Sequence, residues 1–187
     1  MTTAALSPGY LAAHERAALI RRSRGLIVVS GRDRAAYLQG LLTNDIVALT
    51  PGHGCYAAYL TAQGRMITDL HVYELGDAML VVTPPQTKDT VLAKLDQFIF
   101  AEDVQLGDVT DTLGVIALVG PEAAGVAARL TGLDPDALRT LPDDGVVRHV
   151  VADQPVVVMR ISDTGVPALQ LVAPRAYLDA LVERSAS

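Results

Sequence analysis

Apolar residues recur along the chain at two spacings, and together these spacings predict a mixed α+β domain. Alternating runs rich in Val, Ile and Leu predict short strands, whereas apolar residues at every third or fourth position predict helices. The pattern predicts a helix at residues 10–23, ended by Gly25, and a second helix at residues 33–42. The other elements predicted for the first half are strands at 26–29, 55–61, 66–75 and 78–83, and a helix from 84 to about 99.

The second half repeats this order of elements. Its predicted elements are strands at 113–119, 146–151, 156–161 and 168–172, and helices at 121–130 and 174–183. Gly31 and Gly120 each follow a strand and precede an Ala-rich helix, and they lie about 90 residues apart. We therefore predict an α/β sandwich made of two related βαβββα halves, about residues 25–110 and 111–187. These halves would form a single domain over residues 1–187, and we expect no C-terminal barrel.

Composition excludes several classes of protein. Half of the 187 residues are hydrophobic and 19% are charged, which is typical of a chain with a packed core. A net charge of −6, two Phe and no Trp argue against a nucleic-acid partner. The longest apolar runs fall far short of the roughly 20 residues of a membrane span, and no signal peptide precedes them. We expect a cytoplasmic protein without a membrane partner.

Cysteine and histidine content predicts no metal site. The single cysteine, Cys55, excludes an internal disulfide and an all-cysteine zinc site within the chain. No two of the four histidines have the spacing of a helical metal-binding pair. A thiol at Cys55 could use His53 as a base, but strand alternation places Cys55 among apolar neighbours, so we predict a small buried side chain. Residues 52–54 lack the spacing of a phosphate-binding loop, so we expect a plain turn there.

Candidate chemistry gathers on the strand at residues 66–75. Alternation places its polar side chains on one face and its apolar side chains, together with Thr68, on the other. If Gln63-Gly64 forms a two-residue turn, Ala58 pairs with Asp69 and Tyr56 pairs with His71. Such a face could hold a polar heterocycle, or it could be an ordinary solvent-facing sheet surface. The predicted polar face carries Ile67, Asp69, His71 and Tyr73, and the other carries Met66, Thr68, Leu70 and Val72.

Several motifs resemble a known family at these positions. The combination of Leu38-Gln39-Gly40 with Thr43-Asn44-Asp45, and later Gln63-Gly64-Arg65 with Asp69, resembles the folate-binding YgfZ-type proteins. These proteins are relatives of the glycine cleavage T protein, an aminomethyltransferase. The match covers the N-terminal part of that family. It extends over residues 26–45 and 63–69, and more weakly over residues 98–104 and 118–121.

The resemblance implies a GcvT/YgfZ-like fold around a pocket for tetrahydrofolate. It places Asp69 at the position of the aspartate that assists one-carbon transfer in the aminomethyltransferase branch. That branch has two adjacent aspartates, whereas this chain has Thr68-Asp69. The cysteine signature of the YgfZ branch is absent, so its role is not transferred to Cys55. We predict Asp69 and His71 as catalytic residues, and the residues expected to bind the folate are Tyr56, Asn44, Arg65 and Asp69.

Three functions follow as hypotheses. The first is a tetrahydrofolate-binding protein with an accessory role in iron-sulfur cluster assembly or repair, or in one-carbon metabolism. The second is an enzyme that tailors another small molecule with Asp69 and His71 as acid and base. The third is a non-catalytic subunit whose pocket is completed by a homodimer or by a partner chain. A fold alone does not choose among them, because one scaffold hosts different chemistries.

Overall fold

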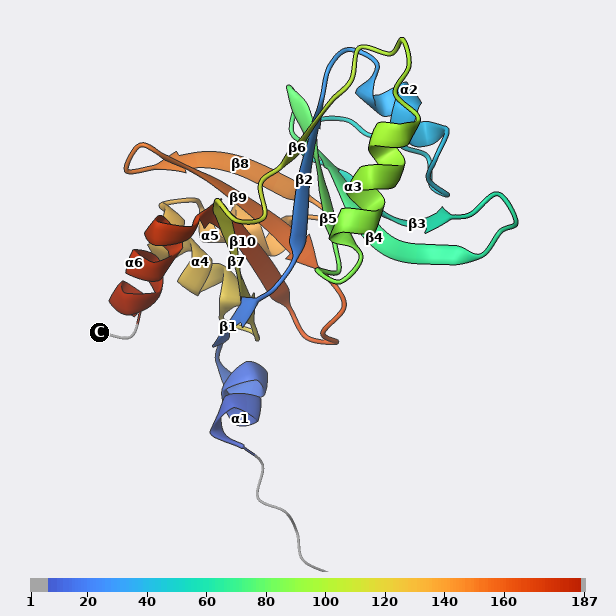
Figure 1. Ribbon diagram of the computed structural model, residues 1–187. Coiled ribbons are helices and arrows are strands. Elements are labelled where there is room, and N and C mark those ends of the chain that lie inside the picture. Colours follow the sequence, from blue (N-terminus) through green and yellow to red (C-terminus); the bar gives the residue numbers. More distant parts are fainter. Residues whose placement is uncertain (1–6, 186–187) are drawn as a thin grey trace, which may run out of the picture. The chain divides into compact units, whose positions relative to one another are not determined.

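The computed structural model describes residues 7–185, and these fall into two compact units (Figure 1). Unit 1 comprises the chain up to Arg22, Val115–Asp143, and the chain from His149 onward. Unit 2 comprises Ser23–Gly114 and Asp144–Arg148. Each unit has its own five-stranded sheet and its own hydrophobic core.

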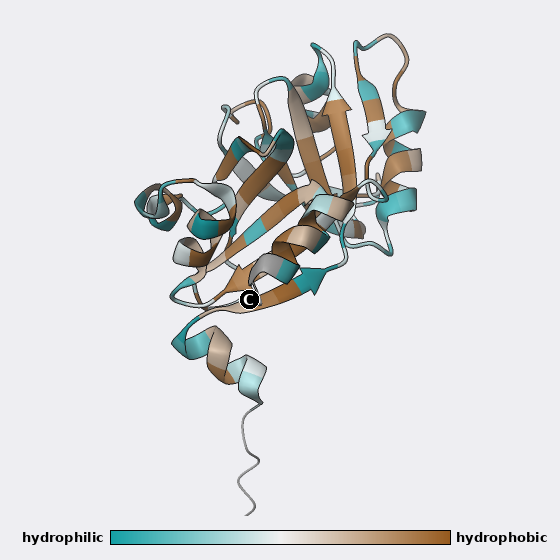
Figure 2. Cartoon of the chain, turned by 90° about the vertical axis from the view of Figure 1, so that its left-hand side faces the viewer, coloured by the Kyte–Doolittle hydropathy of each residue, from teal (hydrophilic) through white to brown (hydrophobic). Residues whose placement is uncertain are grey.

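Unit 2 is a sheet with two helices packed on one face. Helix residues Leu38 and Leu95 are buried in the same core cluster as strand residues Val29, Leu70 and Val81. The strands are largely apolar, as the hydropathy colours of Figure 2 show. The strand order is β3-β4-β5-β2-β6. The elements are β2 (Gly25–Ser30), α2 (Arg34–Gln39), β3 (Gly54–Leu60), β4 (Met66–Glu74), β5 (Ala78–Thr83), α3 (Lys88–Gln97) and β6 (Gln105–Asp108).

Unit 1 has a corresponding sheet in the order β1-β7-β10-β9-β8. Read from its other edge the order is β8-β9-β10-β7-β1, which corresponds strand by strand to β3-β4-β5-β2-β6 of unit 2. The edge strand β1 thus takes the place of β6. The mixed α+β fold predicted from the sequence is therefore confirmed. The elements are α1 (Pro8–Glu15), β1 (Ala18–Arg22), β7 (Leu113–Val119), α4 (Ala123–Thr131), α5 (Pro135–Thr140), β8 (Val146–Val151), β9 (Gln154–Ile161), β10 (Ala168–Pro174) and α6 (Arg175–Ser185).

The helix predicted at residues 10–23 is wrong in its second half. Only α1 is helical, and its N-terminus is capped by Ser7, whose hydroxyl accepts the Tyr10 N–H at 3.2 Å. Residues 18–22 form β1 instead, pairing antiparallel with β7 from Ala18 opposite Val119. No residue of α1 is buried, so packing does not stabilise a longer helix. Pairing with β7 therefore outweighs the local helix propensity of residues 18–22.

Gly25 is the first residue of β2 rather than a helix cap. A Cβ at this position would lie 2.7 Å from Lys88 Cβ and 2.8 Å from Thr83 Cγ2. The glycine therefore allows α3 and β5 to approach the strand closely.

Other predicted boundaries differ by a few residues. The helices in unit 2 are shorter than expected, because α2 ends at Gln39 and α3 begins only at Lys88. The sequence pattern does not predict β6, a four-residue edge strand that contains Gly107 and pairs with β2. It also misses α5, although Asp134 caps that helix by accepting the Asp136 N–H at 3.1 Å.

The β3–β4 turn is longer than the two residues expected. Thr61 N–H donates to Arg65 O at 2.8 Å, and Gly64 has a φ of 78° in the left-handed region. The register shifts between Tyr59 and Leu60, so Leu60 pairs with Met66 and Ile67 is the extra, bulged residue. Ile67 consequently packs against the core and Met66 is 67% exposed, the reverse of the predicted faces for these two residues.

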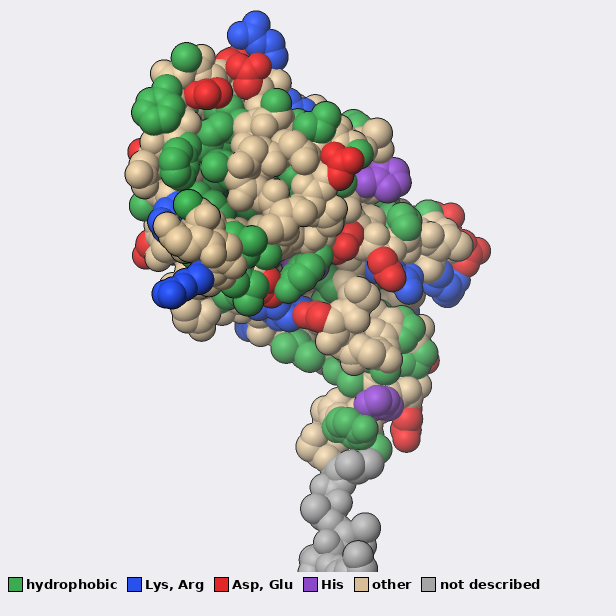
Figure 3. Space-filling model, turned by 90° about the vertical axis from the view of Figure 1, so that its right-hand side faces the viewer, with side chains coloured by type: hydrophobic (Ala, Val, Ile, Leu, Met, Phe, Trp, Pro, Cys, Tyr) green, Lys and Arg blue, Asp and Glu red, His purple; other side chains and the backbone are tan. Residues whose placement is uncertain are grey.

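Acidic and basic side chains are interspersed on the face of the molecule that Figure 3 shows. Among the described residues no helix has the length and apolarity to cross a membrane. The absence of a nucleic-acid partner and the cytoplasmic location stay predictions.

A buried ion pair links the end of β4 to the start of α2 in unit 2. Arg34 Nη2 lies 3.1 Å from Glu74 Oε1 and 3.2 Å from Oε2, and the Glu74 side chain is 6% exposed. Glu74 Oε1 also accepts the Gly76 N–H at 2.6 Å, and the guanidinium donates to the carbonyls of Gly31 and Gly76. The pair therefore satisfies backbone groups at two turns as well as its own charges.

Replacing Glu74 with Gln should destabilise the protein, because it removes the charge of the carboxylate that is hydrogen-bonded to a largely buried guanidinium. We expect the free energy of unfolding to fall by about 3 kcal/mol in urea titrations. Asp77→Asn is the matched control, since Asp77 pairs with Arg148 at 2.6 Å on the surface, and it should cost less than about 1 kcal/mol. Equal losses in the two variants would contradict the role assigned to Glu74.

Candidate functional site

A polar cluster lies on the face of β3 and β4 that is turned away from α2 and α3. Alternation places Leu70 and Val72 in the core under these helices and leaves Asp69 and His71 half-buried on the opposite face. The register predicted for the site is confirmed, since Ala58 pairs with Asp69 and Tyr56 with His71. The bulge lies nearer the turn and leaves these pairs unchanged.

Tyr56 and Asp69 are joined diagonally across the two strands. The Tyr56 hydroxyl donates to Asp69 Oδ2 at 2.9 Å, above the small side chain of Ala58. This hydrogen bond holds the phenol in its neutral form and, with a smaller contribution from burial, raises the pKa of Tyr56. In the described part of the chain only Tyr56 donates to this carboxylate, so Oδ1 is available to a ligand.

His71 is oriented by a second acidic residue, Asp144. Its Nδ1 lies 3.0 Å from Asp144 Oδ1, and its ring stacks against Tyr73 with centroids 6.0 Å apart. The Tyr56 ring meets the imidazole edge-on at 5.1 Å. A carboxylate can only accept, so Nδ1 carries the proton and Nε2 holds the lone pair of the neutral ring. The imidazole therefore has a defined orientation and a nitrogen that can exchange a proton.

Gly54 is required for this packing. A Cβ on Gly54 would lie 2.4 Å from Tyr73 Cδ1 and 2.9 Å from the backbone oxygen of Asp144. The missing side chain lets the buried Tyr73 ring and the turn carrying Asp144 reach β3. Asp144 itself has a φ of 56°, in the left-handed region, where Asp is one of the better tolerated residues.

Asn44 supports the site from the segment beside β3. Its Nδ2 donates to the Tyr56 carbonyl at 2.8 Å, and its Oδ1 accepts the Asp45 N–H at 2.7 Å. Thr43 exchanges two hydrogen bonds with the backbone of Ala58. Asn44 thus contacts the backbone of the site, and its amide is already engaged within the protein.

Arg65 is not brought into the cluster. It lies exposed at the β3–β4 turn, where its backbone N–H donates to Thr61 Oγ1 at 3.2 Å. None of the hydrogen bonds within residues 7–185 joins its guanidinium to Tyr56, Asp69 or His71. The structure therefore unites three of the predicted residues directly, places Asn44 behind them, and leaves Arg65 apart.

Cys55 lies on the core side of β3, half-buried against apolar neighbours. Burial first, and then the charges of Asp144 and Asp45, raise the pKa of the Cys55 thiol to about 11. The thiol is therefore protonated near neutral pH, which suits a packing role better than a nucleophile. His53, the base considered for it, has its Nδ1 3.1 Å from Thr50 Oγ1.

Sequence reasoning missed Asp144. This residue is 73 positions from His71, and no local spacing connects the two. The only signal was an Asp-Asp-Gly turn at residues 143–145, which is common in surface loops. Within residues 7–185, this cluster included, no group of three or more His, Cys, Asp or Glu side chains is arranged to hold a metal ion.

The cluster offers two titratable groups with different surroundings. Asp69 is a carboxylate with one bound phenol, and His71 is an imidazole held by a carboxylate on its far nitrogen. Such a pair can accept hydrogen bonds from a ligand and move a proton at Nε2.

Comparison with known proteins identifies relatives for most of the chain. The model of the GCVT N-terminal domain family matches residues 9–184. An aminomethyltransferase of Bacillus subtilis (strain 168) is 36% identical over 116 residues, which are 62% of this chain and 32% of that protein. The chain thus spans about a third of the length of such curated relatives.

Two solved structures share the fold. Glycine cleavage system aminomethyltransferase T from Bartonella henselae superposes with a TM-score of 0.82 at 24% identity, over 94% of this chain and 46% of that one. A chain of the heterotetrameric sarcosine oxidase from Corynebacterium sp. U-96, solved with pyrrole 2-carboxylate, gives 0.62 at 20% identity, over 94% and 91%. The YgfZ-type assignment within the family stays a prediction.

Neutralising Asp69 should lower the pKa of Tyr56, because the charge-assisted hydrogen bond that favours the neutral phenol is lost. We expect Asp69→Asn to move one tyrosine titration downward toward the ordinary range in absorbance titrations of the phenolate. In the native protein this bond favours folding below the ordinary tyrosine pKa, and the contribution is lost as the pH rises through the raised pKa. Tyr56→Phe identifies the titration that moves, and an identical curve for Asp69→Asn would contradict the assignment.

Proposed function

Because this chain belongs to the GCVT N-terminal domain family, we propose that it binds a reduced folate on the polar face of β3 and β4 and serves one-carbon transfer of the aminomethyltransferase type. The observation that carries the proposal is the cluster itself. Asp69 lies half-buried with one oxygen held by Tyr56 and the other free, next to an imidazole oriented by Asp144.

The chemistry of this face suits a reduced pterin ring. The free Asp69 oxygen would accept an N–H of the heterocycle or stabilise a proton on the reacting nitrogen. The half-exposed Tyr56 ring would offer a flat apolar wall, and His71 Nε2 would accept or donate a further proton. Asn44 would hold the strand segment that carries Tyr56, and in this proposal Arg65 would act only if a ligand reaches the turn.

Two other hypotheses concern the same residues. An acid–base enzyme acting on a different small molecule would use Asp69 and His71 in the same orientation, and the folate titration below separates it from the leading proposal. The accessory role in iron-sulfur cluster assembly rests on the sequence motifs alone.

Calorimetric titration with folinic acid, a stable reduced folate, tests the proposal. We expect saturable binding that Asp69→Ala weakens about tenfold or more, since a hydrogen bond to a charged group is lost. Asp96→Ala on α3 is the matched control, because Asp96 is an exposed carboxylate outside the cluster and should leave the affinity unchanged. The proposal fails if millimolar folinic acid does not bind, or if both alanine variants bind it equally well.

A subunit role is a second candidate. It is favoured by the likeness to a chain of similar length in a heterotetrameric oxidase, of which the match covers 91%. In this proposal a second copy or a partner chain completes the wall of the ligand site.

Light scattering tests the simplest form of this candidate, a homodimer. We expect a particle of twice the mass of the chain, and we expect dilution to the monomer to weaken folinic acid binding, because the second copy supplies part of the wall. A strict monomer that binds folinic acid with full dependence on Asp69 would contradict the homodimer.

A further inference from the structure

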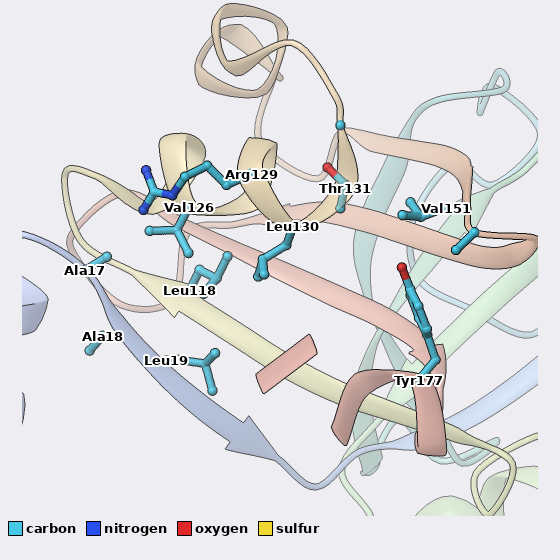
Figure 4. A pocket seen from close by; sticks show the side chains of 12 residues that line it. Ala17, Ala18, Leu19, Leu118, Val126, Arg129, Leu130, Thr131, Val151 and Tyr177 are labelled. Atoms are coloured by element: carbon cyan, nitrogen blue, oxygen red, sulfur yellow. The ribbon is translucent and has the colours of Figure 1, made fainter. Parts of the chain in front are cut away.

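Unit 1 contains a cavity of about 670 Å³ that the folate proposal does not use. It lies under α4 and is bounded by β1, the end of β7, the β8–β9 turn and α6 (Figure 4). All of its lining residues belong to unit 1. Its volume falls in the range of small-molecule sites in proteins.

The wall of this cavity is largely apolar and carries no acidic side chain. Five of its lining side chains are aliphatic: four of them are partly buried and pack against the core of unit 1, and Leu118 is a buried member of that core. These residues are Leu19, Leu118, Val126, Leu130 and Val151.

A cationic side chain lies at one end of the cavity. Arg129 is exposed in the last turn of α4, and its Nη1 lies 3.9 Å from the position of a Cβ on Gly125. No ion pair or hydrogen bond to its guanidinium occurs within residues 7–185. The guanidinium therefore keeps its full capacity to bind an anion.

A buried hydroxyl lies at the other end. The Tyr177 hydroxyl oxygen is buried and has no hydrogen-bond partner within residues 7–185. It points toward the space between α4 and the β8–β9 turn, whereas Arg129 lies beyond Leu118 and Leu130 (Figure 4). Thr131, the remaining hydroxyl of the wall, already donates to Ala127 O at 2.7 Å. An unpartnered buried hydroxyl beside a cavity marks the place where a ligand group would be satisfied.

We propose that this cavity binds a small organic acid with an extended apolar body. Its carboxylate pairs with Arg129, its apolar body lies against Leu118 and Leu130, and a polar atom at its far end bonds the Tyr177 hydroxyl. The charge selects acids, because an amine would meet an unpaired guanidinium and no counter-charge. This site is independent of the folate proposal, since it shares no residue with the β3–β4 face.

Straight-chain probes of matched length test the charge preference. Octanoate should bind and octylammonium should not, and proton–carbon correlation spectra should show shifts confined to methyl groups of the cavity wall. Arg129→Gln should weaken octanoate about tenfold. Arg32→Gln is the control, because this substitution removes the same charge from a side chain that is 80% exposed and lies in unit 2.

A second probe tests the inner end. 8-Hydroxyoctanoate should bind more tightly than octanoate to the native chain, and Tyr177→Phe should abolish that preference without weakening octanoate. Equal binding of octanoate and octylammonium, methyl shifts outside the cavity, or an Arg129→Gln variant with native affinity would each overturn the proposal. Native-like spectra of the free variants establish that they remain folded.

Discussion

Backbone hydrogen bonds between β3 and β4 hold Tyr56 opposite His71 and Ala58 opposite Asp69. Side chains alternate along both strands, so a slip of one residue would move Asp69 and His71 into the apolar core and send Leu70 to the outside. Burying two unpaired polar groups in this way is costly, and the register is correspondingly well specified. The bulge at Ile67 and the left-handed Gly64 absorb the irregularity of the turn before it reaches the site.

The site also depends on groups that lie outside the two strands. Glu74, the last residue of β4, pairs with Arg34, the first residue of α2. Their hydrogen bonds to the Gly31 and Gly76 carbonyls and to the Gly76 N–H hold the β2–α2 and β4–β5 turns. At the same end of the β3–β4 pair, Gly54 lies opposite Tyr73 and leaves space for its ring and for the Asp144 turn. Rigid support of this kind is what a binding or catalytic group requires to keep its orientation without a ligand.

The β3–β4 face and the cavity of unit 1 differ in how far their polar groups are already hydrogen-bonded. In unit 2 the polar residues of the β3–β4 face are bonded to one another, and only single atoms such as Asp69 Oδ1 and His71 Nε2 remain for a ligand. In unit 1 the cavity wall is apolar, and Arg129 and the Tyr177 hydroxyl are both without partners in the described chain. The first arrangement suits a polar heterocycle, and the second suits an apolar acid. Similar strand order in two sheets is thus compatible with different surface chemistry.

The sequence by itself determined the mixed fold, the positions of most strands, and the polar face with Tyr56, Asp69 and His71. These features follow from a period of two residues and from short-range turn residues, which act between neighbours in the chain. Only the tertiary structure decided that residues 18–22 form a strand, because their partner in β7 lies about 100 positions away. It likewise decided that Asp144 orients His71 and that Arg34 meets Glu74, since packing brings together polar side chains that no local spacing relates.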